Sequence, residues 1–505
     1  MRDRAAHAAP AAAVALALSL LLVAPHLSGT DLSASTAHAV FAREHGLTPV
    51  DLRWYGGTQQ FGYSLWSQWA MALFGVRTTG VVSAVVAAAA FALLLRRGDA
   101  GRPVRRPALG AVAGAACIAL NLASGRITYA LGLAVALLAL VALPRRRPAG
   151  LLTLLAVTAS PVAGLFVGLV GAALLLTGRA RDGLALAVPT VLGLAVVGGL
   201  FGQGGTNSMS WADTWTAVLL TVVAGLAVHR RAVRVGAGLL VAGLLAAYAL
   251  STPVGLNAVR LPVMFALPMV LACAPWRLLV LAPTVLAMAL VRPPVQLYDV
   301  RGADLAVNTP GYFAPVAAEL ARRRPTGRVE AVPTVDYWES VHLAQVAPLA
   351  RGWLRQQDTL RDPLFFDGSL SPATYQAWLR DTGVQYVALP AGPLAFVGKA
   401  EGALVRGGLP YLSQVWRGGD WVLYKVAGSP SLADGAQVLR STPAEVALRV
   451  DAPGEVLLRV QPSRWLTLTG PGCLARDGRW LRLRADRAGE FVVSSALQLR
   501  PSAAC

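Results

Sequence analysis

The feature that most constrains this fold is a series of apolar stretches between residues 10 and 291. Each stretch is roughly 15–20 residues long and almost free of charge, close to the length that a helix needs to cross a membrane. Mean hydropathy is +0.54, and only 14% of the residues are charged, whereas soluble domains average about 25%. The chain is therefore predicted to be a polytopic α-helical membrane protein. Nine of its predicted spans lie at about 10–27, 78–95, 107–122, 128–143, 184–201, 214–228, 235–250, 260–274 and 278–292.

Short Arg-rich segments separate many of these stretches, and loops of this kind face the cytoplasm. They lie at 96–106, 144–148, 178–183, 229–234 and 275–277. The loops between them carry little charge and are expected outside; they lie at 28–77, about 121–127, 202–213 and 251–259. We expect a multi-pass protein of the cytoplasmic membrane, with the N-terminus inside and everything after residue 292 outside. The net charge of +19 then belongs to the loops, and no nucleic-acid partner is expected.

Residues 149–177 lie between two basic segments, so a single span there would place one of them on the wrong side of the membrane. Ser160 and Pro161 stand near the middle of this stretch, and Pro interrupts a helix while restricting the residue before it. We therefore expect two short helices that turn at this point, which gives about 11 crossings in all. The first apolar stretch resembles a signal peptide, but an uncleaved first helix suits the many spans that follow.

Composition divides the chain into three parts. Residues 1–292 form the membrane module, including the first outer loop, 28–77. Residues 293–427 alternate helix-like and strand-like pieces, which predicts an extracytoplasmic α/β domain. Residues 428–505 contain evenly spaced strand-like runs, which predicts a terminal β-sandwich-like segment. Cys473 and Cys505 lie in this last part, and an oxidising compartment allows either a disulfide between them or two free thiols.

The first outer loop holds two Asp residues, Asp31 and Asp51, with chemical potential. Asp31 follows the first predicted span, and its simplest role is to cap the helix expected to run to about Glu44. A carboxylate at the membrane surface also suits a glycosyl transfer from a lipid phosphate, because the acceptor hydroxyl must lose a proton. We treat Asp31 and Asp51 as candidate catalytic residues.

Cations at the outer helix ends would hold the phosphate of such a donor, because Arg binds phosphate oxygens through a two-pronged fork. Arg53, Arg126 and Arg260 are the candidates, and Asn257 stands in the same stretch as Arg260. The alternative for each Arg is to extend its charge to the membrane interface. Arg126 and Arg260 stand out because their loops otherwise avoid charge.

The stretch "RWYGGTQQFGYSLW", residues 53–66, is rich in aromatic, Gln and Gly residues. Aromatic side chains suit the faces of sugars, but they also form the belt found at membrane interfaces. Gln adds hydrogen-bonding groups that a belt does not require. The candidate sugar contacts are Trp54, Tyr55, Gln59, Gln60 and Tyr63.

No zinc, P-loop, hydrolase or dinucleotide motif is present in the sequence. The segment "ARGWLRQQD", residues 350–358, mixes Arg, Trp, Gln and Asp within one helical length. It suits a solvated amphipathic helix better than a segment that faces a membrane cavity.

The arrangement of these features resembles the GT-C superfamily of polyprenyl-phosphate-dependent glycosyltransferases. It is similar in particular to bacterial membrane proteins described as 6-pyruvoyl-tetrahydropterin-synthase-related. The resemblance runs from the first helix to about residue 425, and the terminal β-like segment lies outside it. The stretches that carry it are "DLSASTAHAVFAREHG", "DLRWYGGTQQFGYSL", "SPVAGLF", "STPVGLNAVRLP", "VEAVPTVDYWESVHLA" and "LARGWLRQQD".

The resemblance implies that the acidic residue of the first outer loop is the catalytic base or a metal contact, a role that falls on Asp31. Many GT-C enzymes pair two carboxylates, whereas "TDL" offers one, so a divalent metal such as Mg²⁺ or Mn²⁺ stays an open expectation. The pterin-synthase activity in the family's name needs a zinc-binding histidine set that this chain lacks.

The expected function is transfer of a sugar from a polyprenyl-phosphate donor to a cell-envelope acceptor at the outer face of the membrane, among membrane lipids. Two alternatives stay open. A flippase or transporter for a lipid-linked sugar is one, although ion-coupled transport requires polar residues in mid-membrane and the spans hold almost none. A non-catalytic envelope-assembly protein with the same fold is the other.

Overall fold

The computed structural model describes residues 2–22, 29–97, 104–202, 204–295, 299, 305–498 and 504–505. The chain divides into two compact units, and each is described by itself. The first unit is Met1–Ser35 with Phe61–Ala303, and the second is Thr36–Gln60 with Asp304–Cys505. This division differs from the predicted boundaries, because residues 36–60 of the first outer loop pack with the second unit.

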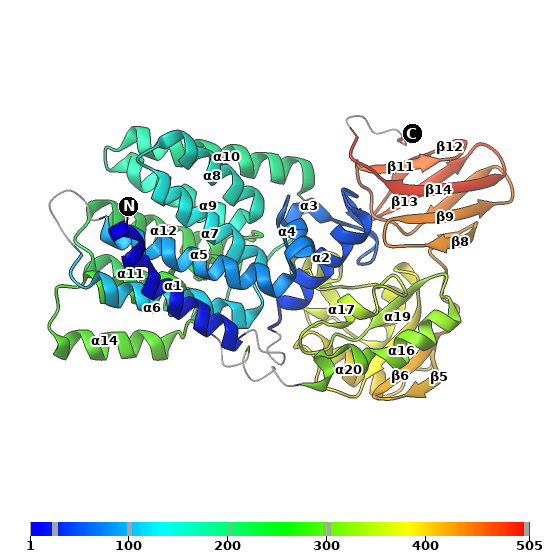
Figure 1. Ribbon diagram of the computed structural model, residues 1–505. Helices are drawn as coiled ribbons and strands as arrows, with labels where there is room; N and C mark the ends of the chain where they lie inside the picture. The colour runs from blue at the N-terminus through cyan, green and yellow to red at the C-terminus, as the bar shows by residue number, and fades with distance from the viewer. Residues whose placement is uncertain are drawn as a thin grey trace. The chain divides into compact units, whose positions relative to one another are not determined.

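The first unit is α-helical, and Figure 1 shows its long helices lying side by side. Small residues allow this packing: a side chain at Gly110 would lie 2.4 Å from the Cβ of Ala272, and one at Gly164 would lie 2.4 Å from Val157. Close approach at small residues is typical of helices in membranes. The helices are α1 (Arg2–Leu22), α3 (Gln60–Tyr63), α4 (Ser67–Phe74), α5 (Val76–Arg96), α6 (Pro107–Leu120), α7 (Ile127–Ala142), α8 (Arg146–Ala159), α9 (Pro161–Leu176), α10 (Ala180–Phe201), α11 (Trp211–Ala227), α12 (Arg231–Ala249), α13 (Arg260–Cys273) and α14 (Leu278–Val291), with 3₁₀ turns η1 (Asn121–Ser124) and η2 (Gly255–Val259).

In the described part of the chain, five helical segments are long and apolar enough to cross a membrane, and five further apolar helices are shorter. The five long segments are Val76–Arg96, Pro107–Ser124, Ala180–Phe201, Arg231–Ala249 and Gly255–Cys273. The number of helical segments long enough to cross a membrane is therefore lower than the predicted total of about 11 crossings. Large apolar side chains such as Leu279, 88% exposed, and Leu192, 58% exposed, lie on the surface. An apolar surface of this kind is typical of a membrane protein, and the identity of the membrane and the orientation stay predictions.

The predicted turn at Ser160 and Pro161 is present. Helix α8 ends at Ala159, Ser160 is extended with φ −152° and ψ 108°, and α9 begins at Pro161. Proline at the first position of a helix leaves no hydrogen bond unmade, so the sequence itself sets this break.

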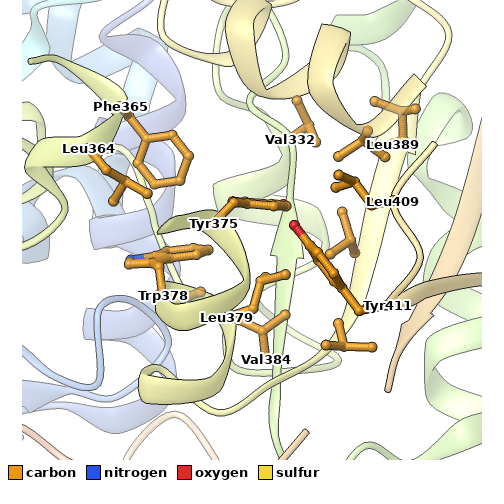
Figure 2. Packing of buried hydrophobic residues seen from close by; sticks show 14 residues of the cluster. Val332, Leu364, Phe365, Tyr375, Trp378, Leu379, Val384, Leu389, Leu409 and Tyr411 are labelled. Atoms are coloured by element: carbon orange, nitrogen blue, oxygen red, sulfur yellow. The ribbon is translucent and has the colours of Figure 1, made fainter. Parts of the chain in front are cut away.

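The second unit contains a four-stranded sheet in the order β3-β4-β6-β5. Strands β3 (Arg328–Ala331) and β4 (Val384–Pro390) are parallel, whereas β6 (Trp421–Val426) is antiparallel to both β4 and β5 (Leu412–Gly418). Figure 2 shows the apolar core against this sheet, where Tyr375, Trp378 and Leu379 lie near Val384 and Leu389. The helices of this part are α16 (Pro310–Arg323), α17 (Glu339–His342), α18 (Arg355–Arg361), α19 (Pro372–Asp381) and α20 (Gly398–Arg406).

The rest of the second unit is rich in strands, as the spaced runs predicted. Two four-stranded sheets have the orders β12-β13-β10-β7 and β11-β14-β9-β8. Cys473 of β12 is joined to Cys505 by a disulfide, which settles the alternative left open by the sequence. The strands are β7 (Ala433–Asp434), β8 (Gln437–Ser441), β9 (Glu445–Val450), β10 (Gly454–Leu458), β11 (Leu466–Thr469), β12 (Gly472–Asp477), β13 (Trp480–Ala485) and β14 (Gly489–Ser495).

Helix α2 (Leu32–His45) begins in the first unit and continues in the second. A short hairpin comes after it, in which β1 (Val50–Asp51) pairs antiparallel with β2 (Thr58–Gln59). The turn between these strands contains "RWYGG", the first five residues of "RWYGGTQQFGYSLW".

Candidate functional site

One carboxylate of the first unit lies against two guanidiniums. Nε of Arg126 lies 3.2 Å from Oδ2 of Asp31, and Nη2 of Arg260 lies 3.6 Å from the same oxygen. The three side chains are partly exposed, at 13% for Asp31, 29% for Arg126 and 16% for Arg260. The three residues are far apart in the sequence, so the fold of the first unit alone brings them together.

Local backbone contacts fix Asp31 at this place. Its N–H donates to the carbonyl of Ser124, and Ser35 Oγ donates to the carbonyl of Gly125. The approach is close, because a side chain at Gly29 would lie 2.1 Å from the carbonyl oxygen of Ala123. Gly125 has φ +72° and directly precedes Arg126, and glycine adopts this conformation without strain.

The two cations occupy helix starts. Arg126 precedes the first residue of α7, and Arg260 is the first residue of α13, where its N–H donates to the carbonyl of Asn257. The Arg260 guanidinium also lies over the ring of Tyr129, 5.0 Å from its centre, an attractive contact between a cation and an aromatic face. Asn257 thus helps to position Arg260 through its backbone.

Tyr63 belongs to the same neighbourhood. Burial raises the pKa of its hydroxyl to about 12, and the negative charge of Asp31 adds to this shift, whereas Arg260 and Arg126 oppose it. The hydroxyl therefore stays protonated at physiological pH and remains a hydrogen-bond donor. Of the candidate sugar contacts, Tyr63 is the one that shares a unit with Asp31.

Asp299 is a second acidic residue that the sequence did not single out. Ser124 Oγ donates to Oδ2 of Asp299, and the backbone carbonyl of the same Ser124 accepts the N–H of Asp31. Burial raises the pKa of Asp299, and the negative charge of Asp31 raises it further. Asp299 comes after the last apolar helix, in a stretch assigned from composition to the α/β domain, and its only sequence signal was its nearness to a membrane helix end.

The donor set around Asp31 does not fit a divalent metal, because two cationic side chains already lie on the carboxylate. Among the described residues, no group of three His, Cys, Asp or Glu side chains is arranged to hold a metal ion. The described residues therefore provide no set of ligands for the expected Mg²⁺ or Mn²⁺.

Asp51 and Arg53 form a buried ion pair in the second unit. Both are about 1% exposed, and Arg53 donates from Nε and Nη2 to the Asp51 carboxylate, with Nη2 2.7 Å from Oδ2. Arg53 Nη2 also donates to the carbonyl of Ala37, and its guanidinium lies 5.0 Å from the centre of the Phe41 ring. Because both side chains are buried and bonded to each other, we expect this pair to stabilise the second unit.

The neighbouring aromatic residues are engaged inside the second unit as well. Trp54 Nε1 donates to the carbonyl of Ser340, and the Tyr55 hydroxyl donates to the carbonyl of Gly352. Gln59 Nε2 donates to Ser463 Oγ, and the Gln60 N–H donates to the carbonyl of Pro49. These contacts hold Trp54, Tyr55 and one side-chain nitrogen of Gln59 within the second unit, and sugar binding by residues 54–60 stays a prediction.

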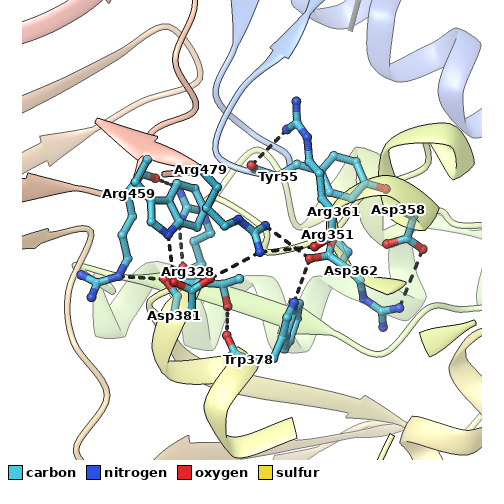
Figure 3. A network of polar contacts seen from close by, with 12 residues as sticks. Tyr55, Arg328, Arg351, Asp358, Arg361, Asp362, Trp378, Asp381, Arg459 and Arg479 are labelled. Atoms are coloured by element: carbon cyan, nitrogen blue, oxygen red, sulfur yellow. Dashed lines mark hydrogen bonds and ion pairs between the residues drawn. The ribbon is translucent and has the colours of Figure 1, made fainter. Parts of the chain in front are cut away.

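The segment 350–358 is part of a buried charge network in the second unit (Figure 3). Arg351 is 3% exposed, and its Nη2 lies 2.7 Å from Oε1 of Glu330. It also pairs with Glu401, and its Nη1 lies 3.9 Å from Asp358. The predicted solvated helix is wrong at Arg351, because this cation neutralises carboxylates in the core.

Two solved structures are similar to this chain: the cryo-EM structure of the arabinofuranosyltransferase AftD from Mycobacteria and that of a mutant of it. The TM-scores are 0.46 and 0.45, with 14% sequence identity in both cases. The match covers 97% of this chain but only 57% and 59% of those chains, so this chain spans somewhat more than half of their length. No family model and no curated protein matches the sequence. A likeness of this degree carries no inference about activity, and the similarity to the pterin-synthase-related family stays an interpretation of the motifs.

Proposed function

We propose that this chain is a membrane glycosyltransferase that moves a sugar from a polyprenyl-phosphate donor to a hydroxyl group of a cell-envelope acceptor at the outer face of the cytoplasmic membrane. The observation that carries the proposal is the contact of the Asp31 carboxylate with the guanidiniums of Arg126 and Arg260. A base and two phosphate-binding cations are the groups that this reaction requires.

In the proposed reaction, Asp31 accepts the proton of the acceptor hydroxyl. The acceptor oxygen forms a bond to the anomeric carbon of the sugar, and the bond from that carbon to the phosphate oxygen breaks. The phosphate oxygen keeps the electron pair, and Arg126 and Arg260 stabilise the charge that develops on it. Hydrogen bonds between guanidinium and phosphate are among the stronger ones in proteins.

The ion pairs seen without a donor are compatible with this role. A guanidinium has five N–H donors, and the close contacts with Asp31 use Nε of Arg126 and Nη2 of Arg260. The remaining donors can bind a phosphate group. An incoming phosphate also competes for the two cations, which makes Asp31 a better base at the moment when the donor is bound.

The test replaces Asp31 by Asn, which keeps the shape of the side chain and removes its basicity. Transfer from radiolabelled polyprenyl-phosphate sugars to envelope acceptors is measured with purified protein in lipid. We expect a loss of roughly 100-fold or more, the usual contribution of a general base, in a protein that still folds. Glu44→Gln, at an exposed position of helix α2, which begins directly after Asp31, is the matched control. Full activity in Asp31→Asn rejects the assignment.

A further inference from the structure

The first unit holds a second feature, a cavity of about 1140 Å³. Small-molecule sites usually measure about 300–1,000 Å³, so this cavity is large. Its walls come mainly from α5, α7, α9, α12 and α13 and are apolar, with Leu137, Phe166, Val170, Leu240 and Phe265 among them. Asp31, Arg126 and Arg260 do not line it. The cavity is therefore distinct from the candidate site, and its role is independent of the proposed function.

The lining of this cavity also includes a group of charged residues. Five Arg and one Asp contribute to it: Arg97, Arg145, Arg146, Arg179, Arg230 and Asp182. Asp182 pairs with two of the cations, at 2.8 Å from Nε of Arg146 and 3.0 Å from Nη2 of Arg179. Among the described residues of the lining, cationic side chains thus outnumber carboxylates. The lining is thus apolar except for one strongly cationic group.

The backbone adds to the positive potential. Arg145, Arg179 and Arg230 directly precede the first residues of α8, α10 and α12. The N-terminal end of a helix carries a partial positive charge and exposes N–H groups. Three helix starts therefore support the five side chains at this group.

We propose that the cavity binds an anionic phospholipid of the membrane, with its phosphate at the Arg group and an acyl chain between the apolar walls. A small soluble anion would leave the apolar volume unfilled, and a zwitterionic lipid would bring a cationic group of its own beside the guanidiniums. An anionic phospholipid satisfies both, and basic pockets between membrane helices are known to suit anionic head groups. The occupant is thus identified by the combined charge and shape of the lining.

The experiment measures lipid binding to the purified full chain by native mass spectrometry, with dioleoyl phosphatidylglycerol and dioleoyl phosphatidylcholine in competition. We expect phosphatidylglycerol to be preferred by roughly tenfold or more, and the preference to fall as salt concentration rises. Equal binding of the two lipids by the unmodified protein overturns the proposal without any variant.

Two variants then locate the site. Arg145→Gln combined with Arg230→Gln should remove most of the preference, because it takes two charges from the Arg group. Gly236→Phe should lower phosphatidylglycerol occupancy, because Gly236 lines the cavity and the new ring would take up part of its volume. A Cβ atom at this position would lie no closer than 3.6 Å to any neighbouring atom, so the backbone accepts the side chain. Arg277→Gln removes the same charge from an exposed residue outside the lining and should change nothing.

Two outcomes would contradict the proposal, one in the variants and one in a further lipid competition. One is an unchanged preference in both altered proteins. The other is displacement of phosphatidylglycerol by undecaprenyl phosphate in direct competition, which would assign the cavity to the tail of a polyprenyl lipid.

Discussion

Arg126 and Arg260 contact the same atom of Asp31, its Oδ2 oxygen, at 3.2 Å and 3.6 Å. The two cations come from the starts of different helices, and like charges this close repel each other unless an anion lies between them. Asp31 supplies that anion here. A phosphate that enters the site would meet two guanidiniums already held near one point, so little ordering of side chains is needed for binding.

The first prediction concerns these cations. Replacing Arg126 by Gln removes a charged hydrogen-bond donor, a contact type that contributes about 1.5–3 kcal/mol. We expect undecaprenyl phosphate to bind roughly 10- to 100-fold more weakly, as measured with the purified protein in detergent, and Arg260→Gln to act in the same direction. Arg43→Gln, at an exposed position on α2, serves as the control. Equal affinity in all three variants and the unmodified protein would contradict a phosphate-binding role.

The second prediction tests the placement of Asp31. Gly125 has φ +72°, and a side chain there would lie 2.4 Å from the backbone nitrogen of Leu32. Gly125→Ala should therefore displace the start of α2 from the Ser124 carbonyl and reduce transfer as strongly as Asp31→Asn. Gly46→Ala also places Ala at a positive φ but meets no atom within 4 Å, so it should retain activity. Similar activity in the two Ala variants would show that the close contact does not position Asp31.

The sequence indicated Arg126 and Arg260 for a physical reason: charges are costly near membrane helices, so a charge in a loop that otherwise lacks them suggests a use. It could not indicate Asp299, because the contact with Ser124 depends on how the chain folds back after α14. Such a return is a tertiary property with no local pattern.

The stretch around Gly56 shows that composition has more than one interpretation. Its Gly and aromatic residues suggested a sugar site, but Tyr55, Gly56 and Gly57 have φ of 56°, 79° and 129°. These are turn conformations that favour glycine. Trp54 and Tyr55 then serve the core of the second unit. A turn and a core produce the same composition as a binding loop, so composition alone could not separate them.

The third prediction rests on the buried pair of Asp51 and Arg53. Removing one partner leaves an uncompensated buried charge, which costs about 3–5 kcal/mol. Asp51→Asn should therefore lower the free energy of unfolding by roughly this amount in urea, as monitored by tryptophan fluorescence. Changing both residues together, to Leu and Met, should cost less than the single change. A sugar-binding role predicts the reverse pattern, with stability unchanged and KM raised.

The fourth prediction concerns pH. Burial raises the pKa of Asp358 from 3.8 to about 8, and Asp362 and Glu401 raise it further, against Arg351 and Arg355. The folded state thus holds this proton more tightly than the unfolded state. This stabilisation is complete below about pH 4. Above that pH, the free energy of unfolding falls by up to about 1.4 kcal/mol for each pH unit, and the loss is complete once the pH has risen through about 8. The melting temperature of the second unit should fall between pH 5 and pH 8, and the fall should be smaller in the Asp358→Asn variant. Asp420→Asn, at an exposed position, is the control and should show the same fall in melting temperature as the unmodified protein. An equal fall in Asp358→Asn would show that the Asp358 carboxyl does not cause the pH dependence.

The last prediction concerns the disulfide between Cys473 and Cys505, which are 32 residues apart. A cross-link of this length removes conformational entropy from the unfolded chain that corresponds to about 3–4 kcal/mol in the chain-entropy model. Cys473→Ser and Cys505→Ser should each lower the free energy of unfolding of the second unit by up to this amount, and reductant should have the same effect on the unmodified protein but none on either variant. Cys117 and Cys273 are free thiols, so Cys117→Ser with Cys273→Ser provides the control for the number of cysteines. A loss of stability in that control, together with none in Cys473→Ser, would show that the disulfide does not restrain the unfolded chain.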